Sequence, residues 1–230
     1  MLFALPMLAY AITSAQSSEI PTHEDVLPDT PSFSTSKKRM YSKVYFDQQV
    51  TAYCGCDYAA KVPDLASCGL ESISEAYRAK RTEAEHVVPA SEFGTTRDCW
   101  AVGGRKYCEA NDPVFRTFHN DLYNLVPVVG EVNGDRSNYG FGLIEGEVRD
   151  YGSCDFEINR EESRVEPGDN VRGDIARTYF YVDWLYGLDL TAGQRTLFLS
   201  WHFADPVDDL ERARSERIYE LQGKRNPFIR

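Results

Sequence analysis

The last third of the chain shows the hydrophobic periodicity of α-helices. Over residues 172–186, Ile175, Tyr179 and Val182 recur at helical spacing and form one apolar face. A second helix is predicted to begin at Thr191. We expect these helices to supply core and scaffold, because they contain no constellation of catalytic side chains.

Two further helices are predicted from their end signals. Asp205 is a favourable N-cap, Pro206 stands at the first helical position, and Gly223 suits the C-terminal end. Nearer the N-terminus, a helix is expected to start near Thr35 and to run toward Gln49.

The middle of the chain contains short β-type runs. Residues 86–88 and 125–129 are apolar and rich in valine, and a turn-rich stretch separates them. Residues 131–141 are typical of a short polar helix or an irregular turn, and residues 50–84 are loop-rich. Short strands beside helices predict a mixed α+β fold in a single domain.

The N-terminus differs from the rest of the chain. Residues 1–15 are apolar, carry no charge and end in small residues, as the core of a signal peptide does. A buried N-terminal helix is the alternative. Residues 16–34 are rich in Ser, Pro, Thr and acids and predict a flexible segment before a folded domain over residues 35–230.

Six cysteines follow, and an even number in an exported protein favours disulfides. Cys99 and Cys108 flank a Gly-Gly segment, so we expect a bridge across one loop. The alternative is a structural zinc site, for which the single residue between Cys54 and Cys56 is tight. The sequence does not determine the partners of the other four cysteines, which are Cys54, Cys56, Cys68 and Cys154.

The net charge of the chain argues against a nucleic-acid-binding protein, whereas a cluster of polar residues indicates a possible catalytic site. The formal net charge is −11, whereas nucleic-acid binders are usually basic. Yet residues 85–138 hold the densest polar cluster, which forms either a buried network or a catalytic site. Its members are Glu85, His86, Arg105, Asp121, Asn124, Glu131, Asn133, Asp135, Arg136 and Asn138.

Four runs in this region carry a family resemblance: EHVVPA (85–90), GGRK (103–106), DLYNLVP (121–127) and GEVNGDRSN (130–138). RGDIARTY and QGKRNPF, nearer the C-terminus, match as well. The chain resembles the endonuclease I family of secreted nucleases over residues 32–230. The active site of that family is a ββα-metal motif related to the HNH nucleases. The resemblance implies such a motif surrounded by helices, mostly from the C-terminal half.

The implied function is nonspecific endonucleolytic hydrolysis of DNA and RNA, leaving 5′-phosphate ends. We expect a secreted or periplasmic monomer that does not associate with membranes. His86 is the predicted general base, because a neutral imidazole suits that role near pH 7. Glu85 and Asn133 are the predicted ligands of Mg²⁺, with other divalent cations such as Mn²⁺ as alternatives, since hard oxygen donors suit these ions.

Two more residues are predicted to support the reaction. Arg105 is expected to hold a phosphate oxygen, although it could be only a solvated loop tip. Asn124 resembles the central Asn of the HNH motif, which ties the two strands together. Lys106 and Arg136 are further candidates for phosphate contacts.

Adjacent strand residues point to opposite faces. Glu85 and His86 can therefore reach one phosphate only at a strand end or at a bulge. Without the flanking motifs, this dipeptide would be read as a surface pair, and Asn133 as a turn former. Relatives commonly carry an acid in place of His119 and a His in place of Tyr123, and neither position holds the core roles.

Two other functions stay open. One is a catalytically inactive, secreted nucleic-acid-binding or interaction module on the same scaffold, which the acidic charge favours. The other is a structural protein stapled by zinc through its cysteines.

Overall fold

The computed structural model of the protein describes residues 27–146 and 149–230. The predicted signal peptide and most of the predicted flexible segment lie outside the described residues. No helix in these two ranges is long and apolar enough to cross a membrane.

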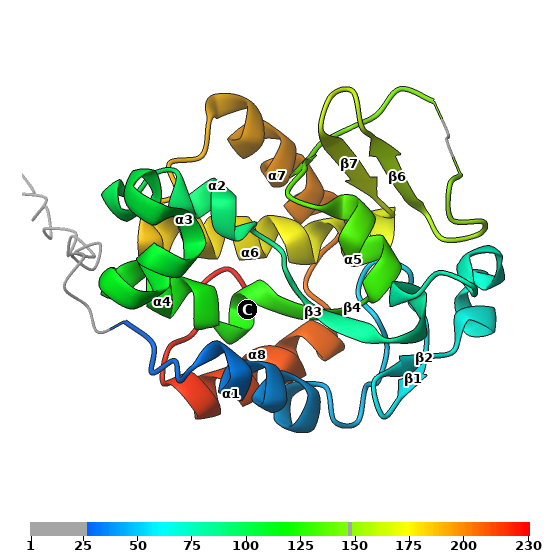
Figure 1. The fold of residues 1–230 in the computed structure, drawn as a ribbon, viewed down its shortest axis with the longest axis horizontal. Coiled ribbons are helices and arrows are strands. Elements are labelled where there is room, and N and C mark those ends of the chain that lie inside the picture. Colours follow the sequence, from blue (N-terminus) through cyan, green and yellow to red (C-terminus); the bar gives the residue numbers. More distant parts are fainter. Residues whose placement is uncertain (1–26, 147–148) are drawn as a thin grey trace, which may run out of the picture.

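A small ββα unit lies at the centre of the fold (Figure 1). Strand β3 (Thr82–His86) pairs antiparallel with β4 (Leu125–Val129), with His86 opposite Leu125. Helix α5 (Gly130–Arg136) follows β4 directly. All five residues of β4 are buried, because protein covers both faces of this strand. The mixed α+β fold is confirmed.

Helix α5 approaches the preceding loop closely. Gly130 and Gly134, one helical turn apart, both lie against Arg78. A side chain at Gly130 would collide with the Arg78 carbonyl oxygen, and one at Gly134 with the Arg78 guanidinium. These glycines of the GEVNGDRSN run therefore let α5 lie flat against this part of the chain.

The segment between the two strands is helical, so the predicted turn-rich stretch is wrong. Phe93, Phe115 and Phe118 are completely buried here and pack on one another, with 4.4 Å between the ring centroids of Phe93 and Phe118. Burial of these aromatic rings outweighs the local turn signals. The three helices are α2 (Ala90–Gly94), α3 (Asp98–Asn111) and α4 (Pro113–Asn120).

The three C-terminal helices match the predicted ones except at one cap. Asp208, not Asp205, is the N-cap of α8, and its side chain accepts a hydrogen bond from Glu211 N. Asp205 is held elsewhere, because its carboxylate accepts from Gly173 N. Gly223 ends α8 in the left-handed region, as predicted. The helices are α6 (Arg172–Tyr186), α7 (Ala192–Ala204) and α8 (Asp209–Gln222).

The N-terminal helix begins earlier and ends earlier than predicted. Helix α1 (Phe33–Arg39) continues as one π-helical stretch, Met40–Val44. Beyond it, Asp47 forms a bidentate ion pair with Arg217 of α8. The remaining strands are short: β1 (Tyr58–Ala59), β2 (Val62–Pro63), β5 (Gly140–Phe141), β6 (Phe156–Asn159) and β7 (Arg164–Pro167).

All six cysteines form disulfides. Cys99 pairs with Cys108, as predicted. The open pairings are resolved as Cys54–Cys154 and Cys56–Cys68, so the two cysteines of the Cys-Gly-Cys run join different partners. No thiol is left to hold zinc, which excludes the zinc-stapled alternative.

Candidate active site

His86 is the last residue of β3, and the backbone of α4 fixes its imidazole. His86 Nε2 lies 2.8 Å from the carbonyl oxygen of His119. Because a carbonyl only accepts, Nε2 must carry the proton and donate it. Nδ1 then holds a lone pair, and no described residue hydrogen-bonds to it.

The surroundings keep this imidazole neutral. Its side chain is buried, and burial is the main cause that lowers the pKa of His86 to about 3. The adjacent His119 and the positive charges of Arg105 and Arg136 lower it further, against the His119 carbonyl, which raises it. A neutral His86 at pH 7 is in the protonation state that a general base requires.

Glu85 points away from His86, toward α5. Its Oε1 accepts a hydrogen bond of 2.5 Å from Arg136 Nη1 and one of 3.4 Å from the Tyr53 hydroxyl. Burial raises the pKa of the Glu85 carboxyl, and the Arg136 guanidinium opposes this shift. Oε2 has no hydrogen-bond partner among the described residues.

Arg136 is a buried anchor, not a phosphate contact. Besides Glu85, its guanidinium donates to the carbonyl oxygens of His86 and Val87, each at 2.8 Å. Its side chain is 1 % exposed. The predicted phosphate contact at Arg136 is therefore wrong, because its donors hold the end of β3.

Asn133 lies on the face of α5 that meets β3. Its Nδ2 donates to Glu83 Oε2 at 2.9 Å, and Glu83 stands two residues before Glu85 on the same strand face. Burial would raise the pKa of Glu83, but ion pairs with Arg78 and Arg81 make the net shift downward. With Nδ2 engaged, Asn133 Oδ1 is left free to accept or to coordinate.

The donors on this face fit a hard divalent cation. Within residues 27–146 and 149–230, neither Glu85 Oε2 nor Asn133 Oδ1 has a hydrogen-bond partner, whereas the second atom of each group is held. Within the described ranges, no group of three or more His, Cys, Asp or Glu side chains could hold a metal. A magnesium ion uses only one or two protein ligands besides water and phosphate, and these two oxygens are the ones on this face that could hold such an ion.

Asn124 joins the two strands just beyond the end of β3. Its Oδ1 accepts from Val88 N at 2.7 Å, and its Nδ2 donates to Val88 O at 3.0 Å. The Asn124 carbonyl also accepts from Val87 N at 3.0 Å. These bonds extend the strand pairing, so the chain after His86 keeps one conformation.

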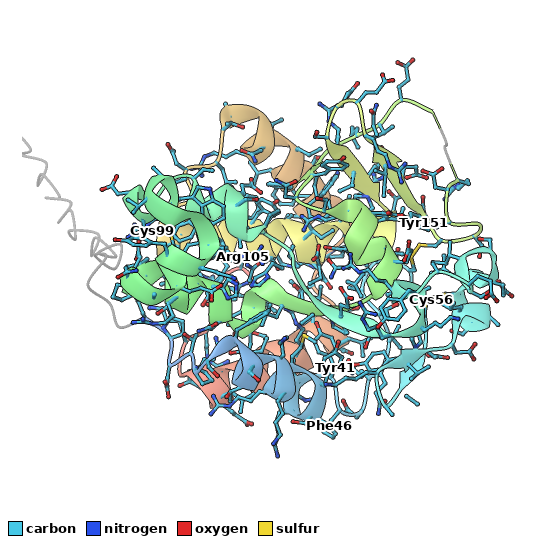
Figure 2. All side chains as sticks on the ribbon, in the orientation of Figure 1. Tyr41, Phe46, Cys56, Cys99, Arg105 and Tyr151 are labelled. Carbon is cyan, nitrogen blue, oxygen red and sulfur yellow. A yellow bond between two sulfur atoms is a disulfide. The ribbon has the colours of Figure 1, made fainter. Side chains whose placement is uncertain are left out.

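Arg105 is exposed on α3, and Figure 2 labels its position. It follows an interruption of the helix at Gly103 and Gly104, where Gly104 has a φ of 61°. The disulfide Cys99–Cys108 spans this interruption. Arg105 is thus part of a stapled helix and not a loop tip. It has no ion pair in the described part of the chain, and its charge helps lower the pKa of both His86 and His119.

The predicted residues lie around the end of β3, but they occupy two different sides of the strand. His86 faces α4, whereas Glu85 and Asn133 lie between β3 and α5. The Glu-His pair lies at the end of a strand and not at a bulge, because the pairing of β3 with β4 runs without interruption to His86. Sequence reasoning missed the role of His119, which contacts the base twice: its carbonyl oxygen hydrogen-bonds to His86 Nε2, and its imidazole packs on the His86 ring with 4.6 Å between centroids.

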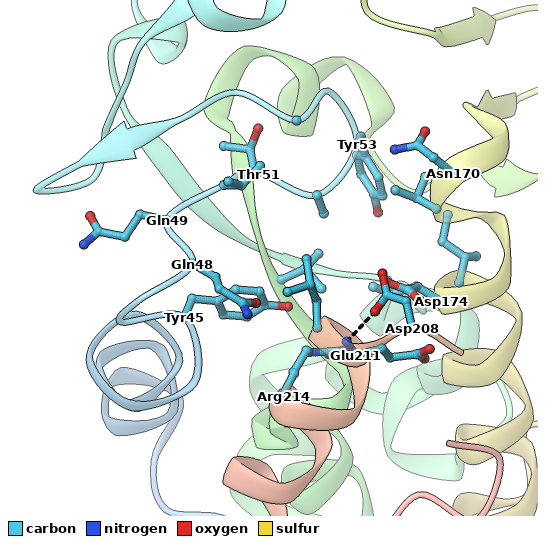
Figure 3. Close-up of a pocket in the computed structure, with 18 of the residues that line it drawn as sticks. Tyr45, Gln48, Gln49, Thr51, Tyr53, Asn170, Asp174, Asp208, Glu211 and Arg214 are labelled. Carbon is cyan, nitrogen blue, oxygen red and sulfur yellow. Dashed lines mark hydrogen bonds between the residues drawn. The ribbon is translucent and has the colours of Figure 1, made fainter. Parts of the chain in front are cut away.

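A cavity of about 690 Å³ lies beside this region, with Val87 and Tyr53 in its wall (Figure 3). Tyr45, Asp174, Glu211 and Arg214 contribute to its walls. None of the five predicted site residues lines it. The candidate active site is therefore the surface around the end of β3 and not this cavity.

An antiparallel strand pair followed by a helix, with a neutral His at the strand end and oxygen donors beside the helix, is the ββα arrangement that the four sequence runs predict. Residues 29–230 match the family described as Endonuclease I, and the chain belongs to that family.

Three relatives illustrate the similarity. The chain is 43% identical to an extracellular deoxyribonuclease of Aeromonas hydrophila, over 97% of this chain and 96% of the relative. It is 42% identical to a periplasmic deoxyribonuclease of the same species, over 98% and 94%. An extracellular ribonuclease of Bacillus subtilis strain 168 is 35% identical over 47% of this chain and 43% of its own length.

Proposed function

We propose that this protein is a secreted or periplasmic, magnesium-dependent endonuclease that cleaves nucleic acid with little sequence preference. One observation carries the proposal: burial keeps His86 neutral, its Nε2 is bound to the His119 carbonyl, and its Nδ1 has no hydrogen-bond partner in the part of the chain that the structure describes. A general base near pH 7 needs that combination of protonation state and orientation.

The residues divide the reaction among them. His86 Nδ1 accepts a proton from the attacking water, while the Nε2 hydrogen bond stabilises the imidazolium that forms. Arg105 holds a phosphate oxygen by charge-assisted hydrogen bonds. Glu85 and Asn133 would hold a magnesium ion, which when bound supplies charge neutralisation at the phosphate and the leaving oxygen. Cleavage on the 3′-oxygen side leaves 5′-phosphate ends.

The substrates follow from the chemistry and the relatives. Attack on phosphorus requires no 2′-hydroxyl, so DNA and RNA both suit this site. Relatives named deoxyribonuclease and ribonuclease support this range. Three disulfides are typical of oxidising compartments outside the cytosol, in agreement with the extracellular and periplasmic relatives.

An inactive nucleic-acid-binding module is the second candidate, because the net charge is −11. The arrangement around His86 disfavours it. A module that only binds has no need of a base with a fixed tautomer beside two free oxygen donors.

A cleavage assay on plasmid DNA and total RNA, with and without EDTA, tests the proposal. His86→Ala should lower the rate by about a hundredfold to ten-thousandfold, the usual contribution of a general base. His202→Ala is the matched control, since His202 lies on α7 and contacts Arg177 outside the site. Near wild-type cleavage by His86→Ala would refute the assignment of the base.

The metal ligands are tested by magnesium titration of Glu85→Gln and Asn133→Ala. Gln keeps an oxygen acceptor for Arg136 but removes the negative charge that Glu85 would offer to the ion. Because the Arg136 charge then lacks its counter-ion, circular dichroism must show that the variant is folded at the assay temperature. Each variant should need more magnesium to reach half of its maximal rate. Unchanged titration curves in both variants would show that the ion binds elsewhere.

A further inference from the structure

The first residue of α1 lies on the predicted base. The Phe33 ring stacks on His86, with 5.2 Å between centroids and 19° between planes. The same ring meets the His119 imidazole edge-on, with 4.6 Å between centroids and 69° between planes. Helix α1 packs beside α4, which carries His119 (Figure 1). A residue more than fifty positions before the base in the sequence is therefore one of its nearest neighbours.

This contact supplies a constraint that the hydrogen bond lacks. The bond from His86 Nε2 to the His119 carbonyl fixes the direction of one ring nitrogen, but the ring can still tilt about that axis. A flat ring stacked on the imidazole face opposes the tilt. The Nδ1 lone pair lies in the ring plane, so a group stacked on the face leaves it accessible to water.

One helical turn further, α1 presents a positive charge. Lys37 stands at i+4 from Phe33, and its Nζ lies 4.7 Å from the Phe33 ring centroid. Lys37 has no ion pair among the described residues. Its charge also contributes to lowering the pKa of His119, although burial is the main cause. This ammonium group is therefore close to the imidazole pair and available to a polyanion.

We propose that the α1 face formed by Phe33 and Lys37 is a wall of the active site. Phe33 is a positioning residue that sets the plane of the His86 imidazole, and Lys37 is a phosphate contact for the bound nucleic acid. This inference rests on the proposed nuclease function and extends it to a helix outside the ββα unit.

Three variants of Phe33 test the positioning role. Phe33→Ala should lower kcat by about tenfold to a hundredfold with little change in KM, because misplacing a reacting group costs about that much. Phe33→Tyr keeps a flat ring and should restore most of kcat. Phe33→Leu keeps apolar cover without a plane and should stay as slow as Phe33→Ala. If Leu restores the rate as well as Tyr does, Phe33 only covers the base and the positioning role is refuted.

Lys37→Ala tests the phosphate contact, with the exposed neighbour Lys38→Ala as the matched control. Lys37→Ala should raise KM about fivefold while leaving kcat unchanged. The slope of log affinity against log salt should become shallower by about one, the value for one lost phosphate contact. Equal effects of the two lysine substitutions would refute a specific role for Lys37.

The wild-type protein separates this inference from the proposed function. If wild-type protein does not cleave nucleic acid, the proposed function fails, and this inference fails with it. If wild-type protein cleaves while Phe33→Ala and Lys37→Ala behave like wild type, the inference fails alone. Circular dichroism melting of each variant identifies a loss of rate that comes from unfolding, and Phe33→Leu then decides the outcome in place of Phe33→Ala.

Discussion

Replacement of Arg136 by Met should destabilise the fold severely, because the buried guanidinium anchors the end of β3. Arg136 donates to Glu85 Oε1 at 2.5 Å and to two backbone carbonyls, those of His86 and Val87, at 2.8 Å. Met preserves the apolar stem but leaves a buried carboxylate without its partner. Breaking a buried ion pair from one side costs about 3–5 kcal/mol, and each orphaned carbonyl adds about 1 kcal/mol or more.

We therefore expect Arg136→Met to lower the free energy of unfolding by about 5 kcal/mol. Urea unfolding followed by tyrosine and tryptophan fluorescence measures this change. Arg160→Met is the control. The Arg160 side chain is 58 % exposed, and its guanidinium lies 3.8 Å and 3.9 Å from two carboxylates. Its replacement should therefore lower the free energy of unfolding by less than about 1 kcal/mol. In the Glu85→Gln background the cost of Arg136→Met should fall, because no buried charge is left unpaired. A loss below about 1 kcal/mol for Arg136→Met alone would refute the anchoring role.

Four other measurements test the remaining structure. Burial lowers the pKa of His86 to about 3. As pH falls from about 6.5 toward 3, His86 therefore binds a proton in the unfolded chain but not in the folded one, and the free energy of unfolding decreases. Between pH 7 and pH 5, wild type should lose about 2 kcal/mol relative to His86→Gln in urea unfolding, and parallel curves would contradict the burial. Asn124→Leu leaves the Val88 N–H and carbonyl without hydrogen-bond partners and should lower the free energy of unfolding by about 2–4 kcal/mol. An unchanged urea midpoint would show that Asn124 does not hold the two strands together. Replacing Cys99 and Cys108 together by Ser should cost about 2–3 kcal/mol in thermal unfolding, the entropy of a short closed loop, and an unchanged Tm would argue against it. Finally, the cleavage rate should pass through a maximum at moderate salt, because salt screens the repulsion between the net charge of −11 and a polyanion before it weakens the few close contacts; a steep decline from the lowest salt would contradict this.

Local signals in the sequence determine much of this protein. Helical periodicity predicts α6, the glycine at residue 223 predicts the end of α8, and the spacing around Gly-Gly predicts the bridge Cys99–Cys108. The runs EHVVPA and GEVNGDRSN single out Glu85, His86 and Asn133 as candidate site residues, although the end of β3 at His86 and the helix that carries Asn133 are open alternatives in the sequence. Each of these features depends on residues within a few positions of one another, so a single sequence is sufficient to find them.

Only the tertiary structure decides how the base is held. The acceptor for His86 is the backbone carbonyl of His119, and every residue has a carbonyl, so no side-chain pattern marks it. Phe33 reaches the same imidazole from a segment that composition alone assigns to a flexible tail. Arg136 has the same charge as any surface arginine, and only the packing of α5 against β3 turns it into a buried anchor. These contacts join residues far apart in the chain, and their energies depend on burial, which arises only when the whole domain has folded.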